Sequence, residues 1–269
     1  MFQAKVLADS INKPYGNRIT TVELTYPRCL HSEYLTHRMF ARNAASSRAI
    51  PVKKMIRDVL ENPFIPSHWG KNQSGMQAKA VLSPFKAAVC RFLWMKSRYV
   101  AVAIVWLMVK IGLHKQIANR LLEPWMWITV IATGNAKAYR NFFRLRCHED
   151  AEPHIQAIAY LLQSVYQSSE PVVPANGWHL PLIGFAGDEA ISEQDLPKVS
   201  TARCARVSYL THAGIRDVSA DIALHDRLSA SNHWSPFEHV AQVSVYLGDG
   251  GNLGLGWYQY RKFFASECP

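Results

Sequence analysis

Residues 36–51 read THRMFARNAASSRAIP, and the interpretation of the chain starts from this stretch. It carries His37, Arg38, Arg42 and Arg48 among small residues and contains no acidic residue to balance them. We predict a helix over residues 30–46, which would place Arg38 and Arg42 one turn apart on the same face. Because like charges at that spacing repel each other unless an anion lies between them, the stretch predicts an anion-binding site. The plainer alternative is a solvated basic face with surface ion pairs.

The end of this stretch has the chemistry of a phosphate site. Ser46, Ser47 and Arg48 supply two hydroxyls and a planar guanidinium, which suit phosphate oxygens. Two later segments, residues 118–124 and NFFRLR at residues 141–146, place further arginines in apolar runs.

These two arginines, Arg120 and Arg146, need partners if the runs are buried. Each could pair with a structural carboxylate, for which Glu123 and Asp150 are the candidates. Together with Arg48 they could instead form a cradle for a phosphate and a base.

Composition restricts the class of protein. The 269 residues are 49% hydrophobic, which is enough for a substantial core, and the net charge of +10 favours anionic partners such as nucleotides, nucleic acid or acidic lipid headgroups. Five cysteines without a C-x-x-C pair indicate neither a disulfide framework nor a zinc site. The opening residues are polar and do not form a secretory signal, so we expect a cytoplasmic protein.

The longest apolar run, residues 99–109, is flanked by Lys96, Arg98 and Lys110. It is shorter than the ~20 residues that a membrane span requires, so we predict a buried helix and no membrane partner.

The order of elements predicts an α+β fold. Residues 18–27 alternate as a half-buried strand does, and a second strand is predicted at residues 241–247. Residues 64–77 are a predicted loop and residues 168–196 a predicted linker. Besides residues 30–46, helices are predicted at residues 52–60, 83–122 with a break near Gly112, 138–167 in two pieces around Pro153, 196–210 and 220–231.

A third polar stretch, NHWSPFEHV at residues 232–240, contains two histidines six residues apart. Because this is not the spacing of a zinc-binding helix, we predict no metal site. His233, Ser235 and Glu238 could instead hydrogen-bond a polar heterocycle, although Ser235 and Glu238 are equally suited to cap local structure.

One internal echo links the two ends of the chain. YLTHRMF at residues 34–40 and WYQYRKF at residues 257–263 share aromatic-x-x-x-Arg-x-Phe at an offset of 223 residues, and each follows a strand-like segment.

Taken together, these stretches resemble the flavin-dependent thymidylate synthases. The hallmark of that family is Arg-His-Arg, seven residues and Ser, with Asn inside the gap and Arg two positions after the Ser. His37, Arg38, Asn43, Ser46 and Arg48 occupy the matching places.

The resemblance extends over most of the chain and implies roles for individual residues. ARVSY at residues 205–209 and HWSPFEH at residues 233–239 are similar to segments that line the flavin in the family. The implied substrate-binding residues are Ser46, Ser47, Arg48, Arg120 and Arg146, of which Arg48 and Arg146 would act in catalysis. The implied cofactor-binding residues are His37, Arg38, Asn43, Asn135, Asn141, Ser208, His233, Ser235 and Glu238.

The order of the segments differs from that of an ordinary member. ARVSY and SPFEH precede the Arg-His-Arg segment in the family, whereas here they follow it by about 170 residues or more. We therefore predict a circularly permuted single catalytic domain over residues 1–269, with a small antiparallel or mixed sheet flanked by long helices. Residues 1–190 would carry the hallmark helix and the nucleotide-binding helices, and residues 195–269 the permuted flavin-binding segment.

The permutation also predicts which segments of the chain lie close together. The echo would be a degenerate second copy of the junction, tolerable where chain termini lie close together at the surface. The strands near Thr20 and Val243 would then share one sheet region, and His233 and Ser235 would reach the cofactor that Arg38 contacts.

Three departures from the family pattern bear on the substrate. Thr36 replaces the first Arg of the hallmark, Ala44 replaces a Glu, and Asp150 stands where the family has a His. Glu267 occupies the place equivalent to Ala44 in the echo, so the C-terminus could supply the missing carboxylate.

The resemblance implies FAD as cofactor, NADPH as reductant and 5,10-methylenetetrahydrofolate as the carbon donor for converting dUMP to dTMP, in a homotetramer with sites at subunit interfaces. One alternative is a hydroxymethylating or cytosine-specific relative acting on dUMP or dCMP. A second is a nucleic-acid-binding protein, less expected than an enzyme, whose affinity would fall steeply with salt and which would hold no chromophore.

Overall fold

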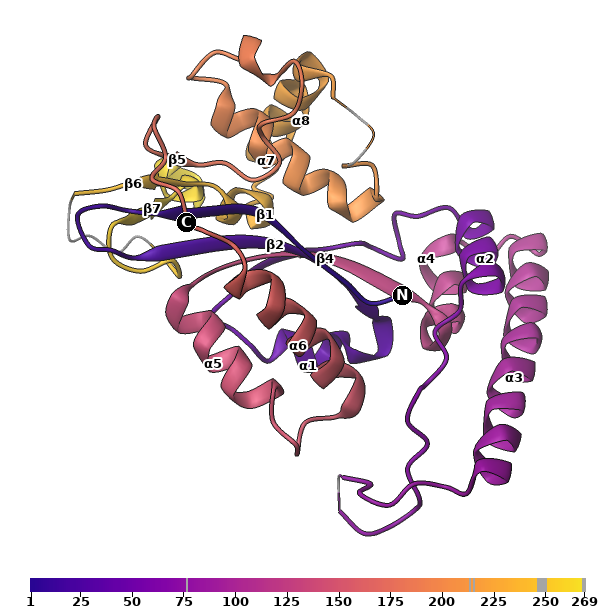
Figure 1. Ribbon diagram of the computed structural model, residues 1–269. Helices are drawn as coiled ribbons and strands as arrows, with labels where there is room; N and C mark the ends of the chain where they lie inside the picture. The colour runs from indigo at the N-terminus through magenta and orange to yellow at the C-terminus, as the bar shows by residue number, and fades with distance from the viewer. Residues whose placement is uncertain (76, 213, 215, 246–250, 268–269) are drawn as a thin grey trace.

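A four-stranded antiparallel sheet with the order β1-β2-β4-β3 runs through the middle of the molecule (Figure 1). The structure, a computed structural model, describes residues 1–75, 77–212, 214, 216–245 and 251–267. The strands of this sheet are β1 (Gln3–Ile11), β2 (Arg18–Pro27), β3 (Ala41–Ala44) and β4 (Trp127–Asn135). Strand β2 has the predicted boundaries, and the predicted α+β class is confirmed.

Strand β2 is buried on both faces, so the prediction of a half-buried strand is wrong. Val22, Leu24 and Tyr26 point into the main hydrophobic core. The polar residues between them are covered as well, because Thr21 contacts His179 at 2.8 Å and Glu23 contacts His212 at 2.5 Å. The alternation of the sequence therefore separates two buried faces, one apolar and one polar.

Two helices cover the apolar face of the sheet (Figure 1). They are α5 (Ala136–Arg146) and α6 (Pro153–Gln167), and they confirm the predicted helix in two pieces. Asn135 begins α5, since its side chain accepts a hydrogen bond from the backbone N–H of Ala138 at 2.9 Å. Glu152 caps α6 in the same way, and Pro153 occupies the first turn.

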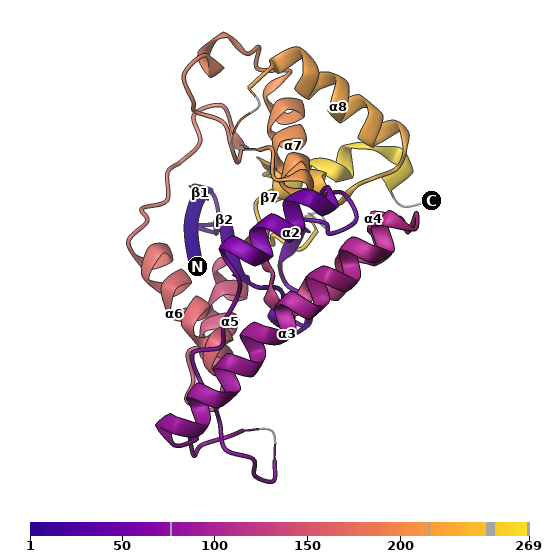
Figure 2. The same ribbon diagram turned by 90° about the vertical axis from the view of Figure 1, so that its right-hand side faces the viewer.

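At one end of the sheet lie α2 (Val52–Glu61), α3 (Pro84–Lys110) and α4 (Lys115–Ala118), followed by the 3-10 helix η2 (Asn119–Trp125) (Figure 2). The predicted break is confirmed at Gly112, whose positive φ of 98° ends α3. The inner face of α3 is fixed to this end of the molecule by Arg98, which donates to the carbonyls of Val59 and Leu60 at 3.1 and 3.0 Å.

The outer face of α3 corrects a second prediction. The apolar run at residues 99–109 is helical, but most of it is not buried: Val100 is 61% exposed and Trp106 is 57% exposed. By length and composition α3 could cross a membrane, and it is the one such helix in the described part of the chain. The helix is attached to the folded α+β body through Arg98.

The C-terminal segment covers the polar face of the sheet (Figure 1). It contains α7 (Leu196–Arg206), α8 (Val218–Ala230) and a small antiparallel sheet of β5 (Trp178–His179), β6 (Ala241–Val243) and β7 (Trp257–Gln259). Both predicted helices are confirmed. The predicted strand at residues 241–247 is shorter in the described region, and its last two residues lie outside that region.

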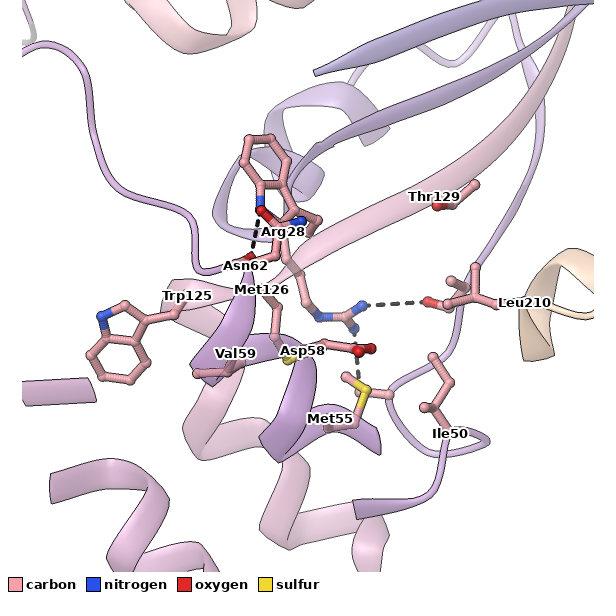
Figure 3. Close-up of a pocket in the computed structure, with 13 residues that line it drawn as sticks. Arg28, Ile50, Met55, Asp58, Val59, Asn62, Trp125, Met126, Thr129 and Leu210 are labelled. Carbon is pink, nitrogen blue, oxygen red and sulfur yellow. Dashed lines mark hydrogen bonds between the residues drawn. The ribbon is translucent and has the colours of Figure 1, made fainter. Parts of the chain in front are cut away.

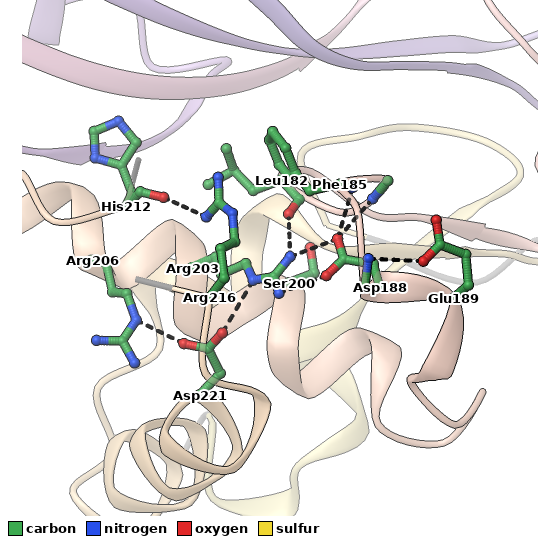
Figure 4. A network of polar contacts seen from close by, with 12 residues as sticks. Leu182, Phe185, Asp188, Glu189, Ser200, Arg203, Arg206, His212, Arg216 and Asp221 are labelled. Atoms are coloured by element: carbon green, nitrogen blue, oxygen red, sulfur yellow. Dashed lines mark hydrogen bonds and ion pairs between the residues drawn. The ribbon is translucent and has the colours of Figure 1, made fainter. Parts of the chain in front are cut away.

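A buried ion network holds α7 and α8 together (Figure 4). Arg203 is fully buried, contacts Asp188 through two hydrogen bonds of 2.8 and 2.7 Å, and donates from Nε to Asp221 at 3.1 Å. Arg206 donates to the other oxygen of Asp221 at 2.7 Å. Each buried charge is thus paired and hydrogen-bonded, as charges without water must be.

A buried hydrogen-bond chain joins the two sheets. Ser10 contacts His179, His179 contacts Thr21, Thr21 contacts Thr133, and Thr133 contacts His239, at 2.6 to 2.8 Å per step. Burial lowers the pKa of both histidines to about 3, so both are neutral at physiological pH.

Short helical elements connect or follow the strands and the longer helices. They are η1 (Arg28–Leu30), α1 (His31–Leu35), η3 (Asp188–Ala190), η4 (Val207–Tyr209), η5 (Ser235–His239), η6 (Tyr260–Phe263) and η7 (Ala265–Glu267).

The predicted helix over residues 30–46 is wrong beyond residue 35. Helix α1 ends at Leu35, residues 36–40 turn, and β3 follows. In β3, Asn43 pairs with Ile131 of β4, so sheet pairing with a distant strand overrides the local helical pattern. Arg38 and Arg42 consequently do not share a helix face.

Two expectations about the ends of the chain are also corrected. The strands near Thr20 and Val243 lie in different sheets, joined through a cluster of Ile19, Ala241, Leu253 and Trp257. The echo has no common structure, because residues 34–40 end α1 and turn whereas residues 257–263 form β7 and η6.

Candidate active site

A cavity of about 280 Å³ lies between the turn after α1 and helix α5. The cavity brings two separate sequence motifs together, the hallmark stretch and the NFFRLR segment. Its lining residues are Thr36, His37, Arg38, Met39, Phe40, Ala138, Asn141, Leu145 and Arg146.

His37 is the buried polar residue at this cavity. Its ring packs edge to face on Phe142 at 4.8 Å, and its Nε2 accepts a hydrogen bond from Nε of Arg146 at 2.9 Å. Burial, followed by the charge of Arg146, lowers the pKa of His37 to about 4. The imidazole is therefore neutral, and because Nε2 accepts, its proton is on Nδ1.

Arg146 is oriented from two sides. Besides the bond to His37, its Nη1 lies 3.4 Å from Oε2 of Glu33. The predicted alternative partner Asp150 lies instead near Lys79 and His148, at 4.0 and 3.8 Å. The guanidinium is thus held at the cavity rim in one orientation.

Sequence reasoning missed Glu33. It lies four residues before His37, a spacing that brings side chains together on a helix and could have suggested the contact. The chain turns after Leu35, yet both side chains still reach Arg146.

The arginines of the hallmark stretch differ in their contacts and in their exposure to solvent. Arg42 donates to the backbone carbonyls of Leu35 and His37 at 2.6 and 3.4 Å, which fixes the turn. Arg38 and Arg48 are exposed, and Arg38 lines the cavity. Arg38 is therefore available to an anion at the cavity, whereas Arg42 serves the fold.

A second cluster gathers around Glu123. Two of its members, Arg28 and Ser47, also line an apolar cavity of about 140 Å³, which Figure 3 shows with Arg28 labelled. Glu123 contacts Nε of Arg28 at 3.0 Å, Oγ of Ser47 at 3.3 Å and Nη1 of Arg120 at 3.8 Å. Arg120 is exposed and pairs with the carboxylate named as its plainer partner, and the structure does not bring it to the cavity of Arg146.

The C-terminal segment reaches the hallmark strand. Oγ of Ser208 donates to Oδ1 of Asn43 at 3.3 Å, and Nδ2 of Asn43 donates to the carbonyl of Cys204 at 2.9 Å. The backbone N–H of Ser46 donates to the carbonyl of Ser208 at 3.0 Å. Asn43 and Ser208, predicted from opposite ends of the chain, are thus direct neighbours.

The SPFEH segment forms η5, which packs on β3. His233 is exposed, Ser235 is partly exposed, and the carboxylate of Glu238 accepts from Arg261. Burial raises the pKa of Glu238, an effect that Arg261 opposes. Among the described residues, those lining the cavity of His37 include none of these three.

Two further predicted residues have structural partners. Glu267 accepts from Arg261 and Lys262 at 2.6 Å each. Besides capping α5, Asn135 donates from Nδ2 to the carbonyl of Leu253 at 3.2 Å.

A comparison with protein families matches residues 10–173 to the Thy1 family, described as thymidylate synthase complementing protein. The chain belongs to this family. The match covers 164 of 269 residues (173 − 10 + 1), more than half of the chain, and includes every residue that lines the cavity of His37. The Thy1 family is that of the flavin-dependent thymidylate synthases, which are enzymes. A comparison with curated proteins found no match.

The Thy1 match does not extend to the C-terminal segment. ARVSY and SPFEH, the segments that led to the prediction of a permuted order, both lie after residue 173.

Proposed function

We propose that this protein is a flavin-dependent thymidylate synthase that transfers a one-carbon unit from 5,10-methylenetetrahydrofolate to C5 of dUMP and forms dTMP. FAD would be its cofactor and NADPH the reductant. The observation that carries the proposal is the meeting of His37 and Arg38 with Asn141 and Arg146 at one cavity.

The chemistry of the cavity suits an anionic cofactor with a polar ring system. Arg38 offers an exposed guanidinium, Asn141 an amide, and the neutral His37 keeps Arg146 in place. When bound, FAD supplies the redox and carbon-transfer chemistry, while the protein binds and orients the reactants.

The size of the cavity supports a site shared between subunits. At about 280 Å³ it lies just below the roughly 300 to 1,000 Å³ of typical small-molecule sites. We propose that a second chain completes the binding site, as in the proposed homotetramer.

Arg146 has the properties required of a group that acts on the pyrimidine. Its guanidinium is permanently charged and is fixed by His37 and Glu33 before any substrate arrives. A preoriented cation of this kind stabilises negative charge that develops on a uracil carbonyl. Ser46, Ser47 and Arg48 are proposed to bind the phosphate, with Arg120 contributing from the neighbouring helix.

A permuted chain order is part of the proposal. The contacts of Asn43 with Cys204 and Ser208 support it, because they join the hallmark strand to the ARVSY segment. Ser235 and Glu238 of η5, together with His233 just before it, would complete the flavin site in the same or a neighbouring subunit.

The first experiment is a titration of the purified protein with FAD, followed by visible absorbance. We expect saturable binding with the spectrum of a bound oxidised flavin. Absence of binding at high FAD concentration would contradict the proposal and leave the nucleic-acid alternative, which salt-dependent binding of DNA or RNA would then test.

The second experiment resolves the products of dUMP or dCMP by mass, in the presence of methylenetetrahydrofolate and NADPH. We expect dTMP from dUMP. Arg146→Ala should abolish this turnover, whereas Arg140→Ala, an exposed arginine on the same helix, should leave it unchanged.

One observation favours a second candidate, a hydroxymethylating or cytosine-specific relative. Thr36 lines the cavity at the position where the family has an arginine, so the charge that meets the substrate differs. A hydroxymethyl product, or turnover of dCMP alone, would establish this candidate in place of dTMP synthesis.

A further inference from the structure

The outer face of α3 is a continuous stripe of large exposed side chains. Its inner face is used for packing, with Val105 fully buried and Nε1 of Trp94 donating to the carbonyl of Phe64 at 3.0 Å. The helix runs along the outside of the molecule (Figure 2). The exposed apolar residues of α3 and its end are Phe85, Val89, Phe92, Leu93, Tyr99, Val100, Ile104, Trp106, Leu107, Val109 and Ile111.

The stripe is larger than the surface of a monomer usually exposes. An aromatic side chain presents roughly 150 to 250 Å² of surface, so with four aromatic and seven aliphatic members about half exposed, the stripe offers on the order of 1,000 Å². The largest apolar patch of a typical soluble monomer is roughly 300 to 600 Å². A surface of this size requires a partner.

The charges on α3 itself are all positive, although Glu61 and Glu123 lie on α2 and η2, which contact this helix. Residues 62–122 contain nine Lys and Arg and not one Asp or Glu. Within the stripe, Lys96 lies over the ring of Phe92 and Lys110 over the ring of Trp106, each with Nζ 5.2 Å from the ring centre. The aliphatic parts of the two lysine side chains thus lie along the apolar surface, and their ammonium groups can extend beyond it.

The positive charge of α3 favours an anionic partner over a second copy of the same helix. In an antiparallel pair of α3 helices centred on the stripe, Lys86 of one copy would approach Lys110 of the other, with no acid on either helix to balance them. An anionic lipid surface satisfies both properties at once, because the apolar side chains enter the acyl boundary while the lysines remain among the phosphates.

We propose that α3 is a peripheral membrane-binding helix that lies flat on an anionic lipid surface. The helix does not span the bilayer, because spanning would remove Arg98 from the carbonyls of Val59 and Leu60 and Trp94 from Phe64. The inference concerns where the protein acts and is independent of its proposed chemistry.

The test is sedimentation of the full-length protein with lipid vesicles at low salt. Vesicles of phosphatidylcholine with about one third phosphatidylglycerol should bind the protein, and vesicles of phosphatidylcholine alone should bind it about tenfold or more weakly. Raised salt should weaken the anionic binding. Equal binding to both kinds of vesicle, or none to either, would overturn the proposal.

Variants separate the two contributions of the stripe. Phe92→Ser with Leu107→Ser should reduce binding about tenfold or more by removing apolar area, and Lys96→Glu with Lys110→Glu should abolish the preference for anionic vesicles. Val172→Ser with Val173→Ser, at exposed apolar residues outside α3, is the matched control and should bind normally.

Sedimentation velocity of the same proteins without lipid tests whether a second copy of the chain, and not a lipid surface, covers the stripe. We expect Phe92→Ser with Leu107→Ser to keep the oligomeric state and the circular dichroism of the unchanged protein. If this variant instead dissociates into a smaller species, the stripe is an interface between copies of the chain and the proposal fails.

Discussion

Acid should destabilise this protein through the two buried histidines that join its sheets. His179 and His239 both have a pKa of about 3 in the folded protein, lowered from 6.5 by burial. Since the folded pKa lies below the unfolded one, their neutral forms contribute full stability above about pH 6.5. This contribution decreases as the pH falls below that value.

The magnitude follows from the size of the shift. Each histidine costs about 1.4 kcal/mol per pH unit below its unfolded pKa, because only the unfolded state takes up the proton. At pH 5 the loss is therefore about 2 kcal/mol per histidine and about 4 kcal/mol for the pair. Folded domains are stable by about 5 to 15 kcal/mol, so this loss is large. His37, with a pKa of about 4, acts in the same direction.

The assay is urea unfolding followed by circular dichroism at several pH values between 7.5 and 5. His239→Asn preserves a polar partner for Thr133 and removes one titrating group, so the pH dependence should fall by about 2 kcal/mol over this range even if overall stability changes. His233→Asn, at an exposed histidine, is the control and should keep the full dependence. A free energy of unfolding that is constant from pH 7.5 to 5 would refute this account of the buried chain.

Three further results are expected. If the proposed activity is present, Glu33→Gln should lower turnover of dUMP by up to about fivefold with no change in flavin binding, because it removes a partly exposed charge that orients Arg146; an unchanged rate would show that His37 alone orients Arg146. Asp221→Ala leaves two arginines without their buried carboxylate and should cost about 3 to 5 kcal/mol in urea unfolding. Gly134→Ala puts a Cβ 2.7 Å from the ring of Phe40, so the melting temperature should fall by an amount that corresponds to about 1 to 3 kcal/mol; a melting temperature equal to that of the unchanged protein would mean that the ring moves freely.

The sequence correctly predicted those elements that begin or end at a local signal such as a proline or a helix cap. Strand β2 follows the alternation and Pro27, and the helices on either side of Pro153 follow their caps. The hallmark stretch has a local pattern typical of a helix. It forms a strand because Asn43 pairs with Ile131, which lies almost ninety residues away in the sequence. Register with a distant strand cannot be read from a local period.

Burial was harder to predict than secondary structure. An apolar run indicates which residues favour a nonpolar environment, but not whether the protein itself covers them, and in α3 it does not. The polar positions of β2 show the converse, since Thr21 and Glu23 look like a solvent face until the C-terminal segment covers them.

The candidate site was predictable as a set of residue types rather than as a geometry. The sequence predicts a cradle of Arg48, Arg120 and Arg146, but of these only Arg146 lines the cavity, where it meets His37 and Arg38. Arg120 has the same local sequence character as Arg146 but pairs with Glu123 outside that cavity. Only the fold distinguishes these two arginines.

The hydrogen bonds between the two ends of the chain also bear on how the protein is made. Asn43 obtains its acceptor from Cys204, and Thr133 obtains its partner from His239. At roughly 5 to 20 residues per second, a ribosome takes about 10 to 30 s to reach Cys204 after it has added Asn43. Throughout that time the polar groups on this face of the sheet can form hydrogen bonds only with water or with a chaperone. Translation that stops early would therefore release a sheet whose polar face is exposed to solvent and whose hallmark strand lacks its contacts with the C-terminal segment. Cellular proteases can recognise such a form.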